Sequence, residues 1–144
     1  MHFIRKRRNP TDIQILETIY NKYYDKFKDF DEKTKDRETK VYIPIDLKSV
    51  AEDLKVDGDI VFGRLYYYLD YKYRYTNESK SKVYFFAAFE IPNSRHCINF
   101  PYLASILADL RDKQKKYKTA TTISVLSLGI AIVSLLVSIL VKTI

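Results

Sequence analysis

The chain has few residues of the types that catalyse reactions or bind metals. Its histidines are His2 and His96, and its one cysteine is Cys97. These residues do not make a cluster with the ligand spacing of a metal site. Because neighbours on a strand point to opposite faces, His96 and Cys97 are not expected to act as a nucleophile and base. We expect Cys97 to be a small core residue.

Glycine is too scarce to build a phosphate-binding loop. The three glycines, Gly58, Gly63 and Gly129, lack the close spacing that such loops require. The acidic residues are mixed with lysines throughout, which is typical of a solvated surface. We therefore predict a protein that is not an enzyme and that has no catalytic residue, metal or cofactor.

The C-terminal region contains 23 successive uncharged residues, 119–141, between Lys118 and Lys142. As a helix, this run is roughly 35 Å long at about 1.5 Å per residue, against a hydrocarbon core of about 30 Å. It predicts a single transmembrane helix over residues 119–142. Because so few residues follow the run, we expect insertion as in tail-anchored proteins. The basic start MHFIRKRRN lacks the apolar segment of a signal peptide, and one cysteine is typical of a reducing compartment.

Basic residues on either side of the run predict its orientation. Five cations lie within residues 109–118, whereas Lys142 alone follows the run. Lys and Arg beside a span are retained in the cytoplasm, so we expect a cytoplasmic N-terminal domain. Cations near a membrane also attract anionic headgroups. The expected lipid or phosphate contacts are Arg5, Lys6, Arg7, Arg8, Lys113, Lys115, Lys116 and Lys118.

The net charge of +7 is concentrated at the two ends of the N-terminal region. Residues 1–8 carry +4 and residues 109–118 carry +3, whereas residues 9–108 carry −1. This distribution favours a lipid bilayer over nucleic acid as the binding partner of the cationic residues. The basic arm, residues 1–9, could also reach a phosphate backbone or be a solvated terminus.

The residues before the span predict one small α+β domain. A helix over about residues 10–30 is expected to begin either at Asn9 and Pro10 or at a capping box of Thr11 and Gln14. Residues 31–40 are nearly all charged and predict a solvated loop, and a short strand follows at 41–45. The apolar face of the first helix is expected to contain Ile13, Leu16, Tyr20, Tyr23, Phe27 and Phe30.

The run VAEDLKVDGDIVFGRL contains two short helices joined by a turn at residues 56–58. Asp46 is expected to cap the first helix, and the second begins near Asp59. Two strands, 71–75 and 82–89, are predicted next, joined by the polar hairpin TNESKS. This order resembles a winged helix-turn-helix domain, in which that hairpin would be the wing; a generic small α+β domain is the alternative. The resemblance implies core contacts by Val50, Ala51, Leu54, Val56, Val61 and Leu65.

The predicted second helix is unlike a helix that reads DNA. Asp57 and Asp59 would repel phosphate, and Phe62 offers no hydrogen bond to a base edge. Arg64 is the one cation between Lys55 and Lys72. For the two aspartates, capping of the helix is the simpler role. The candidate partner surface consists of Asp57, Asp59, Phe62 and Tyr66.

Tyrosines crowd residues 66–75. The three at 66–68 must point around a helix, so at least one is expected in the core and at least one partly exposed. Those at 71, 73 and 75 alternate with charged residues, as on a strand with one buried face. We do not interpret them as a base-stacking surface.

Residues 99–118 are predicted to form an amphipathic helix and a basic juxtamembrane stalk. Asn99 can cap a helix whose packing residues are Leu103, Ile106, Leu107 and Leu110. Because no proline or glycine occurs between Tyr102 and Leu128, this helix should continue into the span as a rigid stalk. The expected fold is thus a winged-helix-like domain over residues 10–98 followed by one long helix.

Small residues recur in the span at steps of three and four, as in a coiled-coil seam. They predict a homo-oligomer, although the serines could instead bond to their own helix. The candidate transmembrane interface is Ala120, Ser124, Ser127, Ala131, Ser134 and Ser138.

These features favour a membrane-anchored cytoplasmic interaction or adaptor module that binds a protein partner. The alternative is a membrane-tethered winged-helix transcription regulator, with residues 5–8, Lys80 and Lys82 contacting phosphate.

Overall fold

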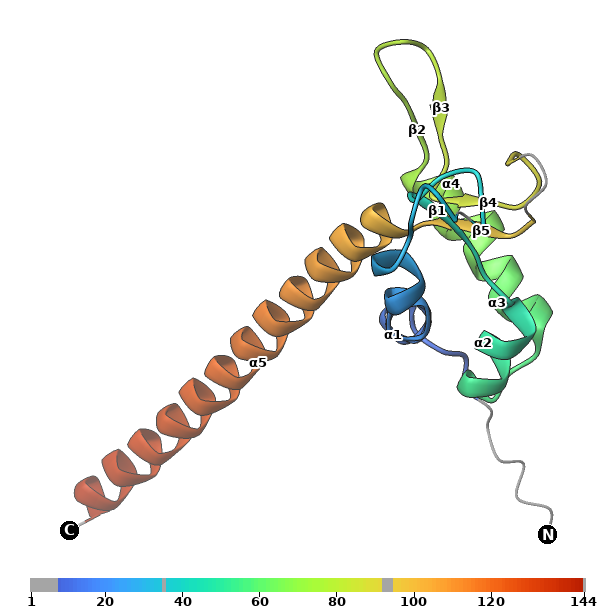
Figure 1. The fold of residues 1–144 in the computed structure, drawn as a ribbon. Coiled ribbons are helices and arrows are strands. Elements are labelled where there is room, and N and C mark those ends of the chain that lie inside the picture. The colour runs from blue at the N-terminus through green and yellow to red at the C-terminus, as the bar shows by residue number, and fades with distance from the viewer. Residues whose placement is uncertain (1–7, 35, 92–94, 144) are drawn as a thin grey trace, which may run out of the picture. The chain divides into compact units, whose positions relative to one another are not determined.

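The computed structural model describes residues 8–34, 36–91 and 95–143. The chain forms two compact units, Met1–Leu107 and Ala108–Ile144. The first is an α+β domain of short helices and two small sheets, and the second consists of the greater part of one long helix (Figure 1). The predicted α+β class is confirmed.

Helix α1, Asp12–Lys28, begins at the capping box of Thr11 and Gln14, one of the two predicted starts. Its fully buried residues are Ile15, Leu16 and Ile19. The predicted apolar face was therefore only partly correct: Leu16 is buried, but Ile13 and the aromatic members of the set are half-buried. The buried face of α1 is therefore centred on Ile15, Leu16 and Ile19. The half-buried aromatic rings lie at the edge of this face.

The charged segment 31–40 has no helix or strand in its described residues, as predicted, but one of its cations is buried. The Arg37 side chain is 2% exposed. Its guanidinium donates to Asp36 Oδ1 at 2.8 Å and to the Lys26 carbonyl at 2.9 Å, and it lies 4.6 Å from the Phe30 ring centre. The prediction of a wholly solvated loop was wrong at this residue, because Arg37 joins the loop to the end of α1.

The two helices of the predicted helix-turn-helix run are present. Strand β1, Tyr42–Pro44, leads to α2, Leu47–Leu54, and α3, Gly58–Gly63, follows. Asp46 accepts hydrogen bonds from the backbone N–H groups of residues 48 and 49, and Asp57 accepts one from residue 59. Both predicted caps are confirmed, and Val50 and Ala51 are buried.

The helix that begins with α3 continues further than predicted. It passes through a π-helical segment, η1, Arg64–Asp70, into α4, Tyr71–Tyr73. The predicted strand over 71–75 was wrong, since strand geometry there is confined to β2, Tyr75–Thr76. Asp70 provides a physical reason: its buried carboxylate accepts from the N–H groups of Phe85 and Phe86 at 2.9 and 3.1 Å, which packs the end of the helix against that segment.

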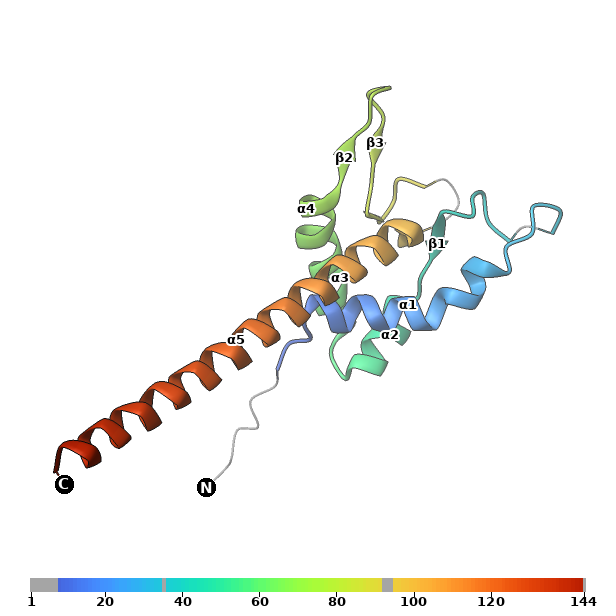
Figure 2. The ribbon, with the colours of Figure 1, turned by 90° about the vertical axis from the view of Figure 1, so that its left-hand side faces the viewer.

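The strands form two separate antiparallel sheets. Strands β2 and β3, Lys82–Val83, make a hairpin that projects on its own in two perpendicular views (Figure 1 and Figure 2). Strands β4, Phe86–Ala87, and β5, Cys97–Asn99, join β1 in the order β1-β5-β4. The predicted hairpin TNESKS is therefore present, but its strands do not pair with β1, and the predicted strand 82–89 is divided between two sheets.

The core of the domain lies between these elements. It contains Leu65 and Leu69 from η1, Phe85 and Phe86, and Ile98 from β5, all 0% exposed. The prediction that Cys97 belongs to the core is confirmed, because it is 1% exposed.

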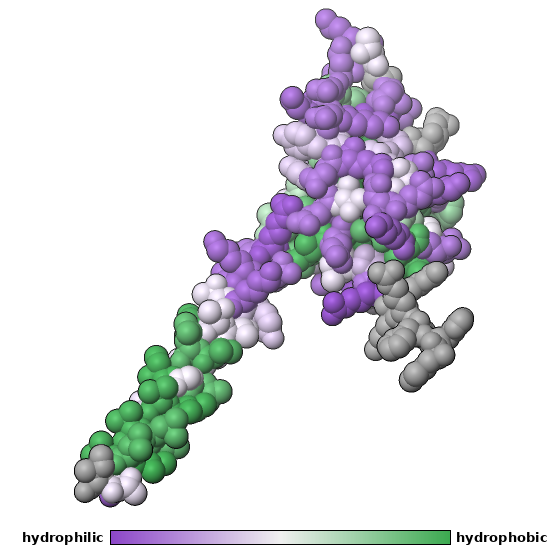
Figure 3. Space-filling view, turned by 90° about the horizontal axis from the view of Figure 1, so that it is seen from below, coloured by the Kyte–Doolittle hydropathy of each residue, from purple (hydrophilic) through white to green (hydrophobic). Residues whose placement is uncertain are grey.

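Helix α5, Phe100–Thr143, runs without a break, as predicted. Asn99 accepts a hydrogen bond from the Tyr102 N–H at 3.2 Å, which confirms the predicted cap. In the first unit Leu103, Ile106 and Leu107 are buried, whereas every described residue from 111 onward is exposed. One window of α5 is long and apolar enough to cross a membrane, and Figure 3 shows this apolar length after a hydrophilic stretch. The chain is consistent with a single-pass membrane protein.

Candidate functional site

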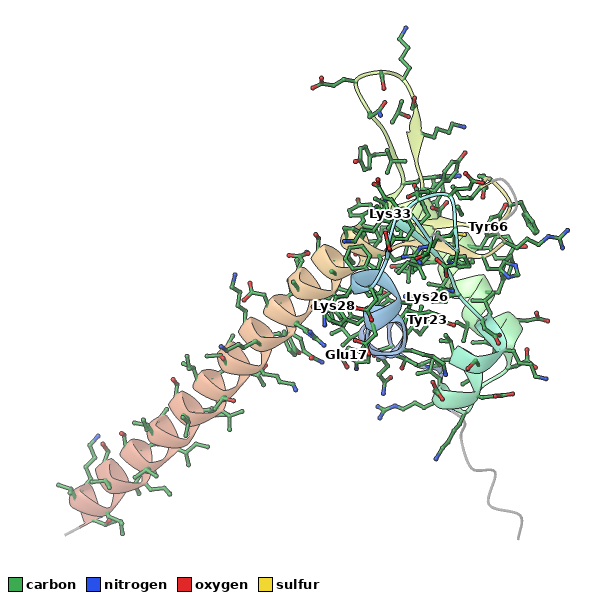
Figure 4. The ribbon with its side chains drawn as sticks, viewed as in Figure 1. Glu17, Tyr23, Lys26, Lys28, Lys33 and Tyr66 are labelled. Atoms are coloured by element: carbon green, nitrogen blue, oxygen red, sulfur yellow. The ribbon has the colours of Figure 1, made fainter. Side chains whose placement is uncertain are left out.

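An aromatic cluster extends from α3 and η1 onto the segment between β4 and β5. We call Phe62, Tyr66, Tyr67, Phe89 and His96 the aromatic surface. The rings of Phe62 and Tyr66 are stacked with centres 5.2 Å apart, and Phe62 meets His96 edge-on at 5.6 Å. Two members remain open to solvent, since Tyr67 is 73% and Phe89 63% exposed. Tyr66 is among the labelled residues of Figure 4.

His96 joins this surface to the core. Its backbone has φ 54°, in the left-handed region that a residue with a side chain rarely adopts. The backbone is held on both sides: the His96 N–H donates to the Ala88 carbonyl at 3.1 Å, and the His96 carbonyl accepts from the Ile45 N–H at 3.0 Å. The imidazole is stacked on Phe86, with ring centres 6.1 Å apart. The surface therefore has a fixed base and exposed rings at its edge.

A shallow groove of about 400 Å³ opens beside these rings. Leu47, Lys48, Gly58, Asp59, Phe62, Phe89 and His96 line it. Its wall is mainly apolar, with one cation and one carboxylate among the lining residues. Such a composition suits an apolar or aromatic group of a partner.

The structure brings part of the predicted partner surface together. Phe62 and Tyr66 stack on each other, and Asp59 lies at the groove with Phe62. Asp57 does not line the groove, and its carboxylate caps α3 by accepting the Asp59 N–H at 2.8 Å. Phe89 was not predicted as a site residue, because it is distant in sequence and was placed within a strand. Its role depends on tertiary contacts with His96 and the groove, which no local sequence pattern indicates.

The exposed tyrosines differ from the prediction. None of the three at residues 66–68 is in the core: Tyr66 is half-buried, and Tyr67 and Tyr68 are 73% and 43% exposed. Tyr71 is 73% exposed instead of lying on the buried face of a strand. The reason is the π-helical turn, which alters the angular spacing of these side chains and leaves Leu65 and Leu69 to fill the core.

Arg64, the one cation of α3 and η1, is held by residues of the domain itself. Its Nε and Nη2 donate to the two carboxylate oxygens of Asp12 at 2.6 and 3.1 Å. Its guanidinium carbon lies 3.7 Å from the ring centre of Tyr68. The Asp12 hydrogen bond raises the pKa of Arg64. Two of the three guanidinium nitrogens are therefore bonded within the domain.

The predicted lipid or phosphate contacts fall into three sets. Arg5, Lys6 and Arg7 lie outside the described residues, whereas Arg8 is exposed. Lys113 and Lys116 each form an ion pair one helical turn away, with Asp109 and Asp112, both at 2.7 Å. Lys115 and Lys118 are exposed. In the hairpin, Lys80 and Lys82 are exposed as well.

In the span, the predicted small-residue face is solvent-exposed over its full length. The hydroxyls of Ser124, Ser127 and Ser134 each donate to the carbonyl four residues earlier, at 2.9 Å. Their donors are satisfied within the helix, while the hydroxyl oxygens can still accept.

Within residues 8–34, 36–91 and 95–143, no group of three or more His, Cys, Asp or Glu side chains could hold a metal ion. No family model, curated protein or solved structure matches this chain.

Proposed function

We propose that the protein is a membrane-anchored interaction module whose aromatic surface binds a protein partner. The main observation in support of this proposal is that aromatic rings near α3 and η1 are exposed, whereas the cation there is bonded within the domain. Arg64, the one cation of α3 and η1, is held by Asp12 and Tyr68, while Tyr67 and the neighbouring Phe89 remain exposed. Tyrosine and other aromatic residues are enriched at protein interfaces, where they bind through large, rigid contact areas.

A winged-helix-like arrangement is part of this proposal. The order α1, β1, α2 and α3 followed by two strands supports it, because β4 and β5 complete one sheet with β1. The wing would then be the connection from β4 to β5, which contributes Phe89 and His96 to the aromatic surface, and the β2–β3 hairpin would be an addition. With this assignment of elements, the proposed protein-binding surface includes the helix that DNA-binding winged-helix domains use for base recognition.

The predicted anchor completes the proposal. Residues 119–142 would cross the membrane once, with the domain on the cytoplasmic side that the basic residues before the span favour. The domain would then be displayed to partners that diffuse to or along the membrane.

Site-specific photo-crosslinking tests the partner surface. A benzophenone amino acid is placed at Tyr67 or at Phe89 in the membrane-inserted chain, and Tyr24, an exposed tyrosine of α1, serves as the control. We expect one discrete protein adduct from Tyr67 and Phe89 and none from Tyr24. Adducts of equal yield at all three positions would show that contacts are unspecific.

A DNA titration tests the regulator alternative. Full-length protein in bilayer discs of zwitterionic lipid is titrated with duplex DNA over a salt series. Because Arg64, the one cation of α3 and η1, is bonded to Asp12, we expect weak binding. Submicromolar affinity that falls steeply with salt would contradict the proposal and favour the tethered regulator.

The span is further proposed to associate through the small-residue face. Chemical crosslinking in membranes compares the native chain with the double variant Ser127→Leu, Ser134→Leu. Loss of the dimer is expected, since leucine would separate the backbones. Unchanged association would assign the serines to bonding within their own helix.

A further inference from the structure

The hydrophilic segment before the span has two chemically different faces. It occupies residues 108–118 of α5, all within the second unit. One face carries two acid–lysine pairs, Asp109 with Lys113 and Asp112 with Lys116, each at 2.7 Å. The hydrogen bond from Lys116 is the main cause that lowers the pKa of Asp112, and the same bond raises the pKa of Lys116. Both groups are therefore charged at neutral pH, and this face is close to neutral.

The cations of the second face lie elsewhere around the helix. At about 100° per residue, Lys118 is roughly 60° from Lys115 around the helix, and Arg111 lies between them, about 40° from Lys115. Lys113 is about 160° from Lys115 by the same geometry. Among the residues that the structure describes, neither Lys115 nor Lys118 forms an ion pair within 4.0 Å. Lys115 acts on Asp112 through a coulombic interaction, but the Asp112 carboxylate is hydrogen-bonded to Lys116, so Lys115 and Lys118 keep an excess of positive charge on this face.

The distance of Lys115 and Lys118 from the apolar run suits contact with a lipid headgroup. Lys118 borders the apolar run, and Lys115 is about 4.5 Å further along the axis at about 1.5 Å per residue. The polar layer on each side of a bilayer is about 5–7 Å thick, which places both ammonium groups within it. Tyr117, between them in sequence, is 75% exposed, and tyrosine is a common residue at this depth.

We infer that Lys115 and Lys118 form a binding site for the phosphate of an anionic phospholipid headgroup, with Arg111 above it on the same face. Two cations three residues apart can both contact one phosphate, and four or more oxygens of the headgroup are available as acceptors. Lys113 and Lys116 are outside this site, because their charges are balanced by aspartates. The inference rests on the membrane insertion that is part of the proposed function.

Lipid selectivity in bilayers tests the assignment. The full chain is reconstituted in phosphatidylcholine with spin-labelled phosphatidylglycerol, and the relative association constant of the two lipids is measured by electron spin resonance. The test variant is Lys115→Gln with Lys118→Gln. The control is Lys113→Gln with Lys116→Gln, which changes the net charge by the same amount on the other face.

We expect the native chain to prefer phosphatidylglycerol by about fivefold or more, since a cation near the surface contributes about that factor. The test variant should lose most of this preference, whereas the control should retain at least half of it. Equal losses in the two variants would overturn the site and assign the effect to net charge.

Flotation and alkaline extraction separate this inference from the proposed function. A native chain that inserts but shows no lipid preference would overturn only the headgroup site. A chain that fails to insert would overturn the anchor and the headgroup site together.

Discussion

Leucine has opposite surroundings in the two units of this protein. Leu65 and Leu69 of the domain are 0% exposed, whereas Leu126, Leu128 and Leu140 of α5 are each 63% exposed. In the domain, apolar side chains leave water by packing on one another, at about 25 cal/mol for each Å² buried. In the second unit, no described residue covers them, which is the surface expected of a helix that meets a bilayer.

The cations show a parallel difference. In the domain, Arg64 and Arg37 are held by carboxylates, a carbonyl and aromatic rings, and the Arg37 side chain is 2% exposed. In the stalk, Lys113 and Lys116 form exposed pairs, with side chains 69% and 77% exposed. Cationic side chains thus contribute to a defined fold in one region and to a polar boundary in the other.

The largest effect is expected from one substitution made in both regions. Leu65→Ala should lower the free energy of unfolding of the domain by about 2–5 kcal/mol, because it opens a cavity in the core. Leu128→Ala should leave that free energy nearly unchanged. Urea titration in mild detergent can follow the near-ultraviolet circular dichroism of the tyrosines, since the chain has 13 Tyr and no Trp. Equal losses of unfolding free energy in the two variants would show that Leu128 supports the fold of the domain as much as Leu65 does.

A charge in the middle of the span should disrupt the second region alone. Ile130→Lys should disfavour membrane integration by about 3 kcal/mol, the cost of a lysine at the centre of a transmembrane helix. Thr122→Lys is the control, because a lysine near the end of the run can extend to the interface. Alkaline extraction reports integration. Full retention of Ile130→Lys in the membrane would contradict a spanning helix.

Asp70 should be the most sensitive polar group of the domain. Asp70→Ala should lower the free energy of unfolding by about 1–3 kcal/mol, because it leaves the buried N–H groups of Phe85 and Phe86 without an acceptor. Asp70→Asn should cost less than half as much, since its amide oxygen can still accept. Chemical denaturation of both variants measures the difference. Equal losses would show that the charge, and not the acceptor, is required.

The same carboxyl should give the domain a pH dependence. Burial raises the pKa of Asp70, while the two backbone hydrogen bonds oppose this shift. Between its ordinary pKa and the raised one, the folded state binds more protons than the unfolded state, so the free energy of unfolding decreases as pH rises through this window. Asp70→Asn should lose this slope. A variant that keeps the native pH profile would assign the slope to another group.

The smallest effect is expected at the Arg64–Asp12 pair. The Arg64 side chain is 39% exposed, so solvent screens the interaction. A double-mutant cycle with Arg64→Ala and Asp12→Ala should give a coupling of at most about 1 kcal/mol in the free energy of unfolding. The expected functional effect is separate: Arg64→Ala should not alter crosslinking from Tyr67. A coupling several times larger would show that the pair is a principal support of the domain.

Local signals predicted the boundaries of several elements correctly. The capping box at Thr11, the caps at Asp46 and Asp57, and the uninterrupted helix after Asn99 all depend on residues within one turn of each other. Such contacts form from neighbouring residues, so the sequence contains the whole interaction.

The errors occurred where distant residues compete with local patterns. Alternating tyrosines predicted a strand over 71–75, but Asp70 packs the preceding helix onto Phe85 and Phe86, fifteen and sixteen residues away. The same packing divides the predicted strand 82–89 between two sheets. A two-residue period in a short segment does not distinguish these outcomes, because strand preference depends strongly on tertiary context.

The sequence by itself determined that this chain has a small α+β domain and one helix able to cross a membrane, since composition, caps and the length of the apolar run are local properties. Only the tertiary structure decided which aromatic rings are exposed, that Arg64 is held by Asp12, and that Phe89 and His96 lie beside Phe62. These features depend on how the core is filled. The core is filled by residues far apart in the chain, and their burial determines which side chains remain at the surface.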